Sequence, residues 1–217
     1  MSSVPDPRCK VCEQALAKAN GTCGNPVCGW TDRSFDWNRS VAMRDGALER
    51  SINRYKYEKR TGWAWIFGRV LAGFLYENSA RFSTFDLIIP SPTYVGPDGR
   101  DFDHTAEVLA EAARLDETGL PYVVDSTVIE KSATTKRLAT CESWQERRYV
   151  CENEVRPVLH VPEPQRIAGK QILVYDDIFT DGLNLNVVAS VLRGSGADRV
   201  CGVTLARQPW GGRLNAV

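Results

Sequence analysis

Short apolar runs alternate with helical patterns through the second half of this chain, and this alternation constrains its fold more than any other feature. The runs lie at residues 85–89, 121–124, 171–175 and 199–205. Apolar side chains at helical spacing fill residues 102–115 and 187–192 between them. Strands that alternate with helices pair in parallel through right-handed crossovers. We therefore predict an α/β fold, a mostly parallel sheet flanked by helices.

Charge and hydropathy exclude two classes of protein. The 27 basic residues balance 27 acidic ones, so DNA binding is not supported by the net charge, because such binding depends on neutralising phosphates. No apolar run approaches the ~18 residues of a membrane span. The first residues lack the charged and then apolar layout of a signal peptide. We therefore expect a cytoplasmic protein without a membrane span.

Four of the seven cysteines lie within the first 28 residues, at Cys9, Cys12, Cys23 and Cys28. Residues 1–32 have almost no apolar periodicity, so burial alone would not fold them. The spacing suits four thiolates on one tetrahedral structural Zn²⁺. A redox disulfide is the alternative, since Cys9 and Cys12 alone would fit one. We predict a zinc-ribbon-like knuckle over 1–32.

Two long segments are predicted from their patterns. Residues 36–80 have apolar side chains at helical spacing and are predicted to be helical, with a break at Thr61-Gly62. Their aromatic cluster, Trp63, Trp65 and Phe67, is interpreted as core. A base-stacking platform is the alternative for this cluster. The basic run Lys56, Lys59 and Arg60 is interpreted as a solvated face. Residues 131–150 are polar and are predicted to form a long mobile loop or an excursion from the domain. The two histidines, His104 and His160, are assigned to the surface or to local packing.

The most informative segment follows the apolar run 171–175. Asp176 and Asp177 come first, then a small polar turn with a glycine, then a helix. A turn that leads into a helix presents backbone N–H groups suited to a phosphate monoester. The two carboxylates could accept hydrogen bonds from a vicinal diol or lie near a cation. Together these groups suit a ribose 5-phosphate, although a metal-binding or receiver-like site of an unrelated doubly wound fold stays open.

Residues 172–182 resemble the phosphoribosyl pyrophosphate (PRPP) signature of the type I phosphoribosyltransferases. Several further elements, in the same order along the chain, resemble the ComF/GntX subgroup, which is linked to DNA uptake and competence. These elements are the four-cysteine knuckle, Tyr55-Lys56-Tyr57, Pro90-Ser91-Pro92, Arg100-Asp101-Phe102-Asp103 and Thr204-Leu205-Ala206-Arg207. The resemblance implies a type I phosphoribosyltransferase-like domain at 83–217, after the knuckle at 1–32 and a helical segment at 33–82.

The resemblance also implies roles for individual residues. Asp176 and Asp177 would contact the ribose hydroxyls, and Arg100 would help to neutralise the pyrophosphate; these three form the expected catalytic set. The 5-phosphate would be contacted by Thr180, Asp181, Gly182, Leu183 and Asn184. The pyrophosphate loop would contain Ser91, Thr93 and Tyr94. Asn184 stands where the family has Ser or Thr, and Asp181 adds a negative charge beside the phosphate.

The function implied is a Mg²⁺-dependent glycosyltransferase, which moves phosphoribosyl from PRPP to an unidentified nitrogenous acceptor and releases pyrophosphate. Residues 131–150 would close over the reacting centre. The alternative is a non-catalytic PRPP- or nucleotide-binding module of the ComF type, with a protein partner bound through the zinc knuckle. A zinc-ribbon nucleic-acid binder is disfavoured by the zero net charge.

Overall fold

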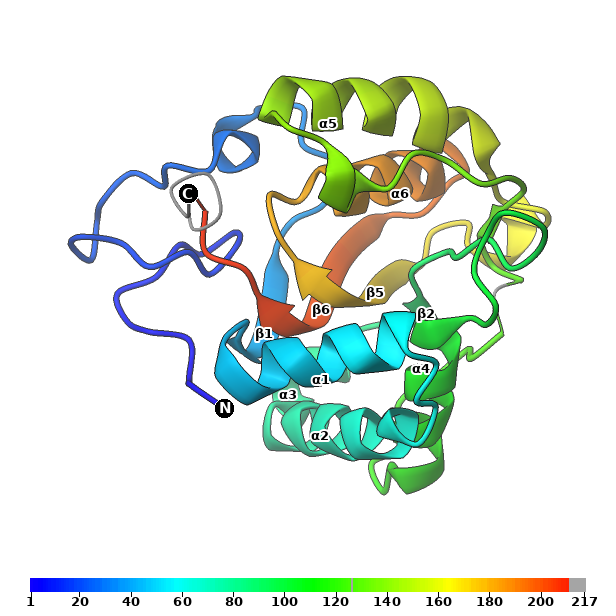
Figure 1. The fold of residues 1–217 in the computed structure, drawn as a ribbon, viewed down its shortest axis with the longest axis horizontal. Helices are drawn as coiled ribbons and strands as arrows, with labels where there is room; N and C mark the ends of the chain where they lie inside the picture. Colours follow the sequence, from blue (N-terminus) through cyan, green and yellow to red (C-terminus); the bar gives the residue numbers. More distant parts are fainter. Residues whose placement is uncertain (126, 211–217) are drawn as a thin grey trace.

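The computed structural model describes residues 1–125 and 127–210, and its centre is a four-stranded parallel sheet (Figure 1). The strand order is β1-β6-β5-β2. The strands are β1 (Asn38–Met43), β2 (Leu87–Pro90), β5 (Gln171–Phe179) and β6 (Arg199–Arg207). All three pairings between them are parallel. Residues 211–217 of the predicted third segment lie outside the described residues.

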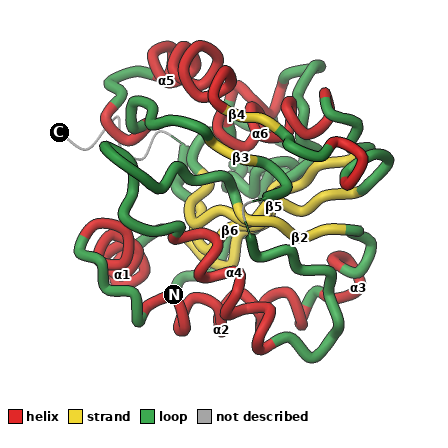
Figure 2. Tube along the Cα trace, turned by 90° about the vertical axis from the view of Figure 1, so that its right-hand side faces the viewer, coloured by secondary structure: helices red, strands yellow, loops and turns green. Residues whose placement is uncertain are grey.

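Helices cover both faces of the sheet (Figures 1 and 2). One face carries α1 (Gly46–Tyr57), α2 (Trp63–Glu77), α3 (Ser79–Phe82) and α4 (His104–Leu115). The other carries α5 (Trp144–Val150) and α6 (Leu183–Gly194). Among the described residues, no helix has both the length and the apolar character needed to cross a membrane. The predicted class is confirmed: a parallel sheet flanked by helices, with a four-cysteine cluster near the N-terminus.

Strand β5 shows why the sheet requires helices on both sides. Ile172 and Val174 belong to the core beneath α6, whereas Leu173 and Tyr175 belong to the core beneath α2 and α4. Side chains alternate between the faces of a strand, so four consecutive buried apolar or aromatic residues at 172–175 require cover on both faces. Burial of these side chains fixes β5 at the centre of the sheet.

The expectation of a wholly helical segment over 36–80 was wrong at β1. Its inward-facing residues include Asn38 and Ser40, which are buried and bonded to each other and to Thr204 of β6. Polar side chains in these positions conceal the period-2 pattern of a strand. The break at Thr61-Gly62 is confirmed, since α1 ends at Tyr57 and α2 begins at Trp63.

The aromatic cluster of α2 is only partly core. Phe67 is buried and stacks on Trp63 with ring centroids 5.5 Å apart. Trp65 is 47% exposed, so the core interpretation was wrong for this residue. The helical period places positions 63 and 67 on one face and turns position 65 away from it.

Residues 131–150 are more ordered than the loop that we predicted. They contain a 3₁₀ turn (Leu138–Thr140) and α5, which continues into a π-helical turn (Cys151–Val155) and a 3₁₀ turn (Arg156–Val158). A small antiparallel ribbon of β3 (Glu130–Lys131) and β4 (Leu159–His160) joins the two ends of this excursion. The Ser143 hydroxyl accepts from Glu146 N–H and caps α5. The Ser-x-x-Glu spacing was the signal for this helix.

Two smaller predictions concern the start of α4 and the expected strand over 121–124. Asp103 caps α4, because its carboxylate accepts from the backbone N–H groups of Thr105 and Ala106. The expected strand over 121–124 makes a single parallel bridge, between Tyr122 and Ile88 of β2. This segment therefore lies at the free edge of the sheet beside β2.

Candidate functional site

A cavity of about 850 Å³ lies at the carboxyl ends of β2 and β5. Asp176 and Asp177 line it together with the segment after β2 and the start of α6. Ligands of parallel α/β sheets bind at this position. The basic side chains that line the cavity are Arg44, Lys56, Arg100, Lys131, Lys136, Arg137 and Arg147. Both an acidic pair and a set of cations therefore face one space.

The acidic pair lies within β5, because this strand runs four residues beyond the predicted 171–175. Asp176 accepts from the backbone N–H of Asp177 at 2.9 Å and from the Asn184 amide at 3.2 Å. Asp177 is 6% exposed. Its Oδ2 lies 2.6 Å from Lys56 Nζ and 3.9 Å from His104 Nε2. Each carboxylate therefore has a distinct environment.

These environments separate the pKa values of the two acids. Burial raises the pKa of Asp176 to about 7, and the neighbouring charge of Asp177 adds to this shift. Burial alone would raise the pKa of Asp177 also, but the charge of Lys56 holds it well below its usual value. Burial and the charge of Lys56 lower the pKa of His104, which stays neutral near pH 7. One acid is thus firmly ionised and its neighbour titrates near neutrality.

Lys56 and His104 were not expected in this site. Lys56 was interpreted as part of a solvated face, but its side chain is only 12% exposed and pairs with Asp177. His104 is buried beside the same carboxylate, and its Nδ1 has no hydrogen-bond partner among the described residues. Pairing between residues so distant in the chain cannot be read from local pattern. The Tyr-Lys-Tyr element was the available signal for Lys56.

The turn between β5 and α6 has the conformation expected of a loop that binds an anion. Gly182 has φ +88°, and α6 begins at the next residue. Thr180, Asp181 and Asn184 line the cavity, whereas the Leu183 side chain is buried. The structure therefore brings the polar members of the predicted phosphate loop to the cavity beside the acidic pair.

Asp181 is buried and does not stand as an uncompensated charge. Its carboxylate accepts from the backbone N–H of Leu183 at 3.0 Å and pairs with Arg147 of α5 at 3.2 Å. Arg147 also donates to the Thr180 hydroxyl at 3.2 Å. The Asp181 carboxylate thus engages a backbone donor and a cation that a phosphate group could otherwise use.

Replacing Gly182 by alanine is expected to lower the free energy of unfolding by about 2 kcal/mol. The added Cβ would lie 2.7 Å from Phe179 Cζ and would require φ near +88°. Gly119→Ala is the matched control, because Gly119 also has positive φ but has no atom within 4 Å of the added Cβ. Urea unfolding should show the larger loss for Gly182→Ala. Equal losses would contradict the steric part of this argument.

The predicted pyrophosphate loop follows β2 and lines the same cavity as the turn. Ser91 is buried, donates its N–H to Tyr175 O at 2.7 Å and accepts from the Thr105 hydroxyl at 2.9 Å. Thr93, Tyr94 and Arg100 line the cavity. The Arg100 guanidinium lies over the Tyr57 ring, and Lys131 donates to the Thr135 hydroxyl. Both cations thus contact neutral groups.

Arg100 and Lys131 repel each other. Burial lowers the pKa of Lys131, and the charge of Arg100 lowers it further. An anion between these side chains would relieve both effects. This end of the cavity is therefore suited to a polyanionic group.

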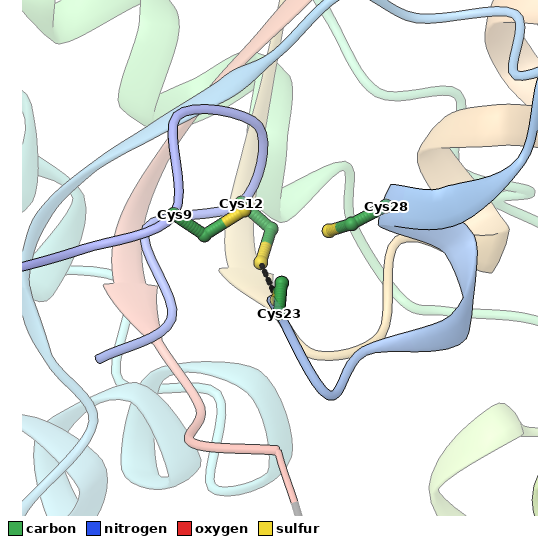
Figure 3. Close-up of side chains that lie close together, drawn as sticks. All are labelled: Cys9, Cys12, Cys23 and Cys28. Atoms are coloured by element: carbon green, nitrogen blue, oxygen red, sulfur yellow. Dashed lines mark hydrogen bonds between the residues drawn. The ribbon is translucent and has the colours of Figure 1, made fainter. Parts of the chain in front are cut away.

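The four N-terminal cysteines converge on one point (Figure 3). Their sulfur atoms all lie within 4.8 Å of one another, and the Sγ atoms of Cys12 and Cys23 are 3.7 Å apart. Tetrahedral zinc with bonds of about 2.3 Å would place its sulfur ligands about 3.8 Å apart. All four are free thiols. This donor set could bind zinc and fits it in both chemistry and spacing.

A second group of possible ligands lies in the cavity. His104, Asp176 and Asp177 offer ligand atoms within 4.8 Å of one another. The Lys56 ammonium already neutralises Asp177 at this point. A cation bound here would compete with Lys56, unless it approached from the side of Asp176.

Comparison with known proteins gives little further information. No family model matches the chain, and no curated protein does. One similar solved structure is described as that of the allosteric regulatory enzyme of purine biosynthesis, with a TM-score of 0.32 and 21% identity. The match covers 55% of this chain and 22% of that one, so this chain spans less than a quarter of that protein's length. A likeness of this extent does not assign a function to this chain.

Proposed function

We propose that this protein binds PRPP and is a phosphoribosyltransferase of type I character, which transfers phosphoribosyl to a nitrogenous acceptor and releases pyrophosphate. One observation carries the proposal: Asp176 and Asp177 share a cavity with the turn residues Thr180, Asp181 and Asn184, which flank the positive-φ Gly182, and with the cations Arg100 and Lys131. PRPP has a matching arrangement of groups, because its ribose lies between a phosphate and a pyrophosphate.

Acidic residues would contact the neutral ribose hydroxyls of PRPP, and a different set of residues would contact its charged 5-phosphate. Asp176 and Asp177 would accept from the ribose hydroxyls, and Thr180, Gly182 and Asn184 would contact the 5-phosphate. Arg147 supports this placement, because its Nε is buried and has no hydrogen-bond partner among the described residues. Arg147 lines the cavity, so a small movement of its guanidinium would bring this unpaired donor to a ligand phosphate.

Negative charge grows on pyrophosphate as its bond to the ribose C1 breaks. Arg100 and Lys131, with Ser91, Thr93 and Tyr94 of the neighbouring loop, would stabilise that charge. Mg²⁺ bound with PRPP would supply further neutralisation of the pyrophosphate. Lys56 would have to release Asp177 before this carboxylate could accept from the ribose. Substrate binding would therefore replace the ion pair between Lys56 and Asp177 with hydrogen bonds from the ribose to Asp177.

The test is pyrophosphate release from PRPP with Mg²⁺ and a panel of nucleobases and small amines. We expect turnover with at least one acceptor, and a decrease of about 10²–10³-fold in Arg100→Met. Arg114→Met is the control, since Arg114 is exposed on α4 and pairs with Glu111 away from the cavity. An absence of both binding and turnover in the unaltered protein would refute the proposal.

The second candidate function is a non-catalytic PRPP- or nucleotide-binding module of the ComF type. Asp181 favours it, because its carboxylate already engages Leu183 N–H and Arg147. Binding of PRPP in a calorimeter without pyrophosphate release would support this module over the transferase. A protein partner would then use the cysteine segment.

Affinity for ribose 5-phosphate should rise with pH because Asp176 has a pKa of about 7. Its ionised form is the better acceptor, so affinity should increase about 10-fold between about pH 6 and pH 8. The phosphate also titrates near pH 6, so Asp176→Asn is the reference. Calorimetry should show a smaller pH dependence in this variant. The same pH dependence in both proteins would contradict the assignment.

We also infer that Cys9, Cys12, Cys23 and Cys28 hold a structural Zn²⁺. Cys12 is fully buried, and Val27 beside Cys28 is buried in the same core as α6. The cysteines therefore fold a loop-rich segment directly against the domain that carries the cavity. No position remains for a water ligand if all four thiolates bind, so the ion would be structural rather than catalytic.

A further inference from the structure

We propose that Arg207 is a positioning residue that couples zinc at the four cysteines to the conformation of the turn at 179–182. The inference rests on the proposed function only for the identity of the group that the turn binds. Arg207 is the last residue of β6 and is 0% exposed. A guanidinium stays charged in proteins, so its burial requires many acceptors.

The acceptors of Arg207 come from two separate places. On one side its Nε donates to Cys12 O at 2.5 Å, and one terminal nitrogen lies 3.5 Å from Cys12 Sγ. On the other side the second terminal nitrogen donates to Thr180 O at 2.8 Å and to Phe179 O at 3.3 Å. The Gln14 amide oxygen and Gln208 O complete the set. One planar group therefore joins the cysteine segment to the turn.

The contact with Cys12 Sγ gives Arg207 a role toward the metal. Four thiolates around Zn²⁺ carry a net charge of about −2, and a buried cation that donates to one of them offsets part of it. In the described part of the chain, the contacts of Arg207 are to sulfur and neutral oxygens rather than to a carboxylate. Its positive charge is therefore better compensated when zinc is bound.

A second contact joins the same two segments. Asn25, between Cys23 and Cys28, donates its amide to Asp181 O at 2.9 Å and accepts from Val27 N–H with its side-chain oxygen. Asn25 is 1% exposed. The carbonyls of residues 179 and 180 are thus held by Arg207, and that of residue 181 by Asn25 of the cysteine segment. Their orientation fixes the direction of the N–H groups that follow at the start of α6.

Through these contacts, zinc binding at the four cysteines and ligand binding at the turn 179–182 depend energetically on each other. Zinc that orders Cys12 and Asn25 also orders the turn, and a ligand that orders the turn should hold zinc more tightly. Linkage requires the two effects to be equal in magnitude. Arg207→Lys should not maintain the coupling, because a compact ammonium cannot span Cys12 and Thr180 as the separate nitrogens of the guanidinium do.

The first test is hydrogen exchange of the full chain, with zinc bound and after removal by a chelator. On zinc removal we expect exchange to increase more in peptides covering 176–186 than in β2, whose amides exchange through global unfolding. The same increase should occur in zinc-loaded Arg207→Lys. Unchanged exchange at 176–186 in stripped protein would overturn the proposal. So would equal loss of protection in β2, since zinc would then hold the whole fold rather than this turn.

The second test is zinc affinity, measured by competition with a chromophoric chelator. Arg207→Lys should bind zinc about 10-fold more weakly than the unaltered protein. Arg199→Lys is the control, because Arg199 lies at the other end of β6 and pairs with Asp36. Equal zinc affinity in the unaltered protein and Arg207→Lys would overturn the role toward the metal.

Ribose 5-phosphate connects the coupling to function. When ribose 5-phosphate saturates the unaltered protein, its zinc affinity, measured by competition with the same chelator, should rise about 10-fold. An equal zinc affinity with and without ribose 5-phosphate would overturn the coupling. Failure of zinc-loaded protein to bind ribose 5-phosphate would instead refute the proposed function, and hydrogen exchange would still decide whether zinc orders the turn.

Discussion

Replacing Lys56 by methionine is expected to lower the free energy of unfolding by about 3 kcal/mol at neutral pH. The substitution removes the ammonium 2.6 Å from Asp177 and leaves an ionised carboxylate that is 6% exposed. Breaking a buried ion pair costs about 3–5 kcal/mol, and contact with the cavity places this pair at the lower end. Urea unfolding at constant m-value gives the measurement.

The double variant Lys56→Met/Asp177→Asn should recover most of this loss, because no buried charge then lacks a partner. Lys59→Met is the control: Lys59 is 63% exposed and pairs with Asp101, so its loss should be less than about 1 kcal/mol. Additive effects of the two cavity substitutions would show that Lys56 and Asp177 do not interact.

The contribution of the Lys56–Asp177 ion pair to the free energy of unfolding should change with pH in one direction. The pKa of Asp177 is held below its usual value by Lys56, so the pair stabilises the fold above the unfolded-state pKa of about 3.9. The contribution is lost as the pH falls through the folded-state pKa. The difference in stability between the unaltered protein and Lys56→Met should therefore disappear in acid and persist above about pH 5.

The sequence predicts the central strands and the glycine turn because these depend on local pattern. β5 is apolar or aromatic at 172–175 and β6 is mostly apolar at 200–206, and Gly182 stands where φ must be positive. A chain that buries such strands needs helices on both sides. The order of the acids and the turn along the chain then places both at the carboxyl end of one strand.

The partners of these residues depend on tertiary packing. Lys56 meets Asp177 only because α1 packs across the sheet, and a lysine among Lys59 and Arg60 has the pattern of a surface. β1 was mistaken for a helix because Asn38 and Ser40 bury polar groups against Thr204. Neither contact leaves a periodic signal, so each becomes visible only when distant segments are placed together.

Replacing Cys28 by serine is expected to release zinc and to weaken the fold by several kcal/mol. Structural zinc contributes about 10–16 kcal/mol of apparent binding free energy in zinc-finger peptides. Here part of the segment is also held by burial of Val27 and Phe35, so we expect a loss of about 4 kcal/mol rather than complete unfolding. Metal analysis and thermal unfolding give the two measurements.

Cys141→Ser separates loss of zinc from loss of a thiol. Cys28 and Cys141 are both half-buried free thiols, but Cys28 alone belongs to the four-cysteine cluster. Serine at 141 should leave zinc content and thermal stability unchanged. Because Cys28 lies next to Val27 in the core under α6, a zinc bond to Cys28 would tie that core to the segment that Arg207 holds. If Cys28→Ser retained zinc and stability, the cysteine cluster would not be a structural metal site.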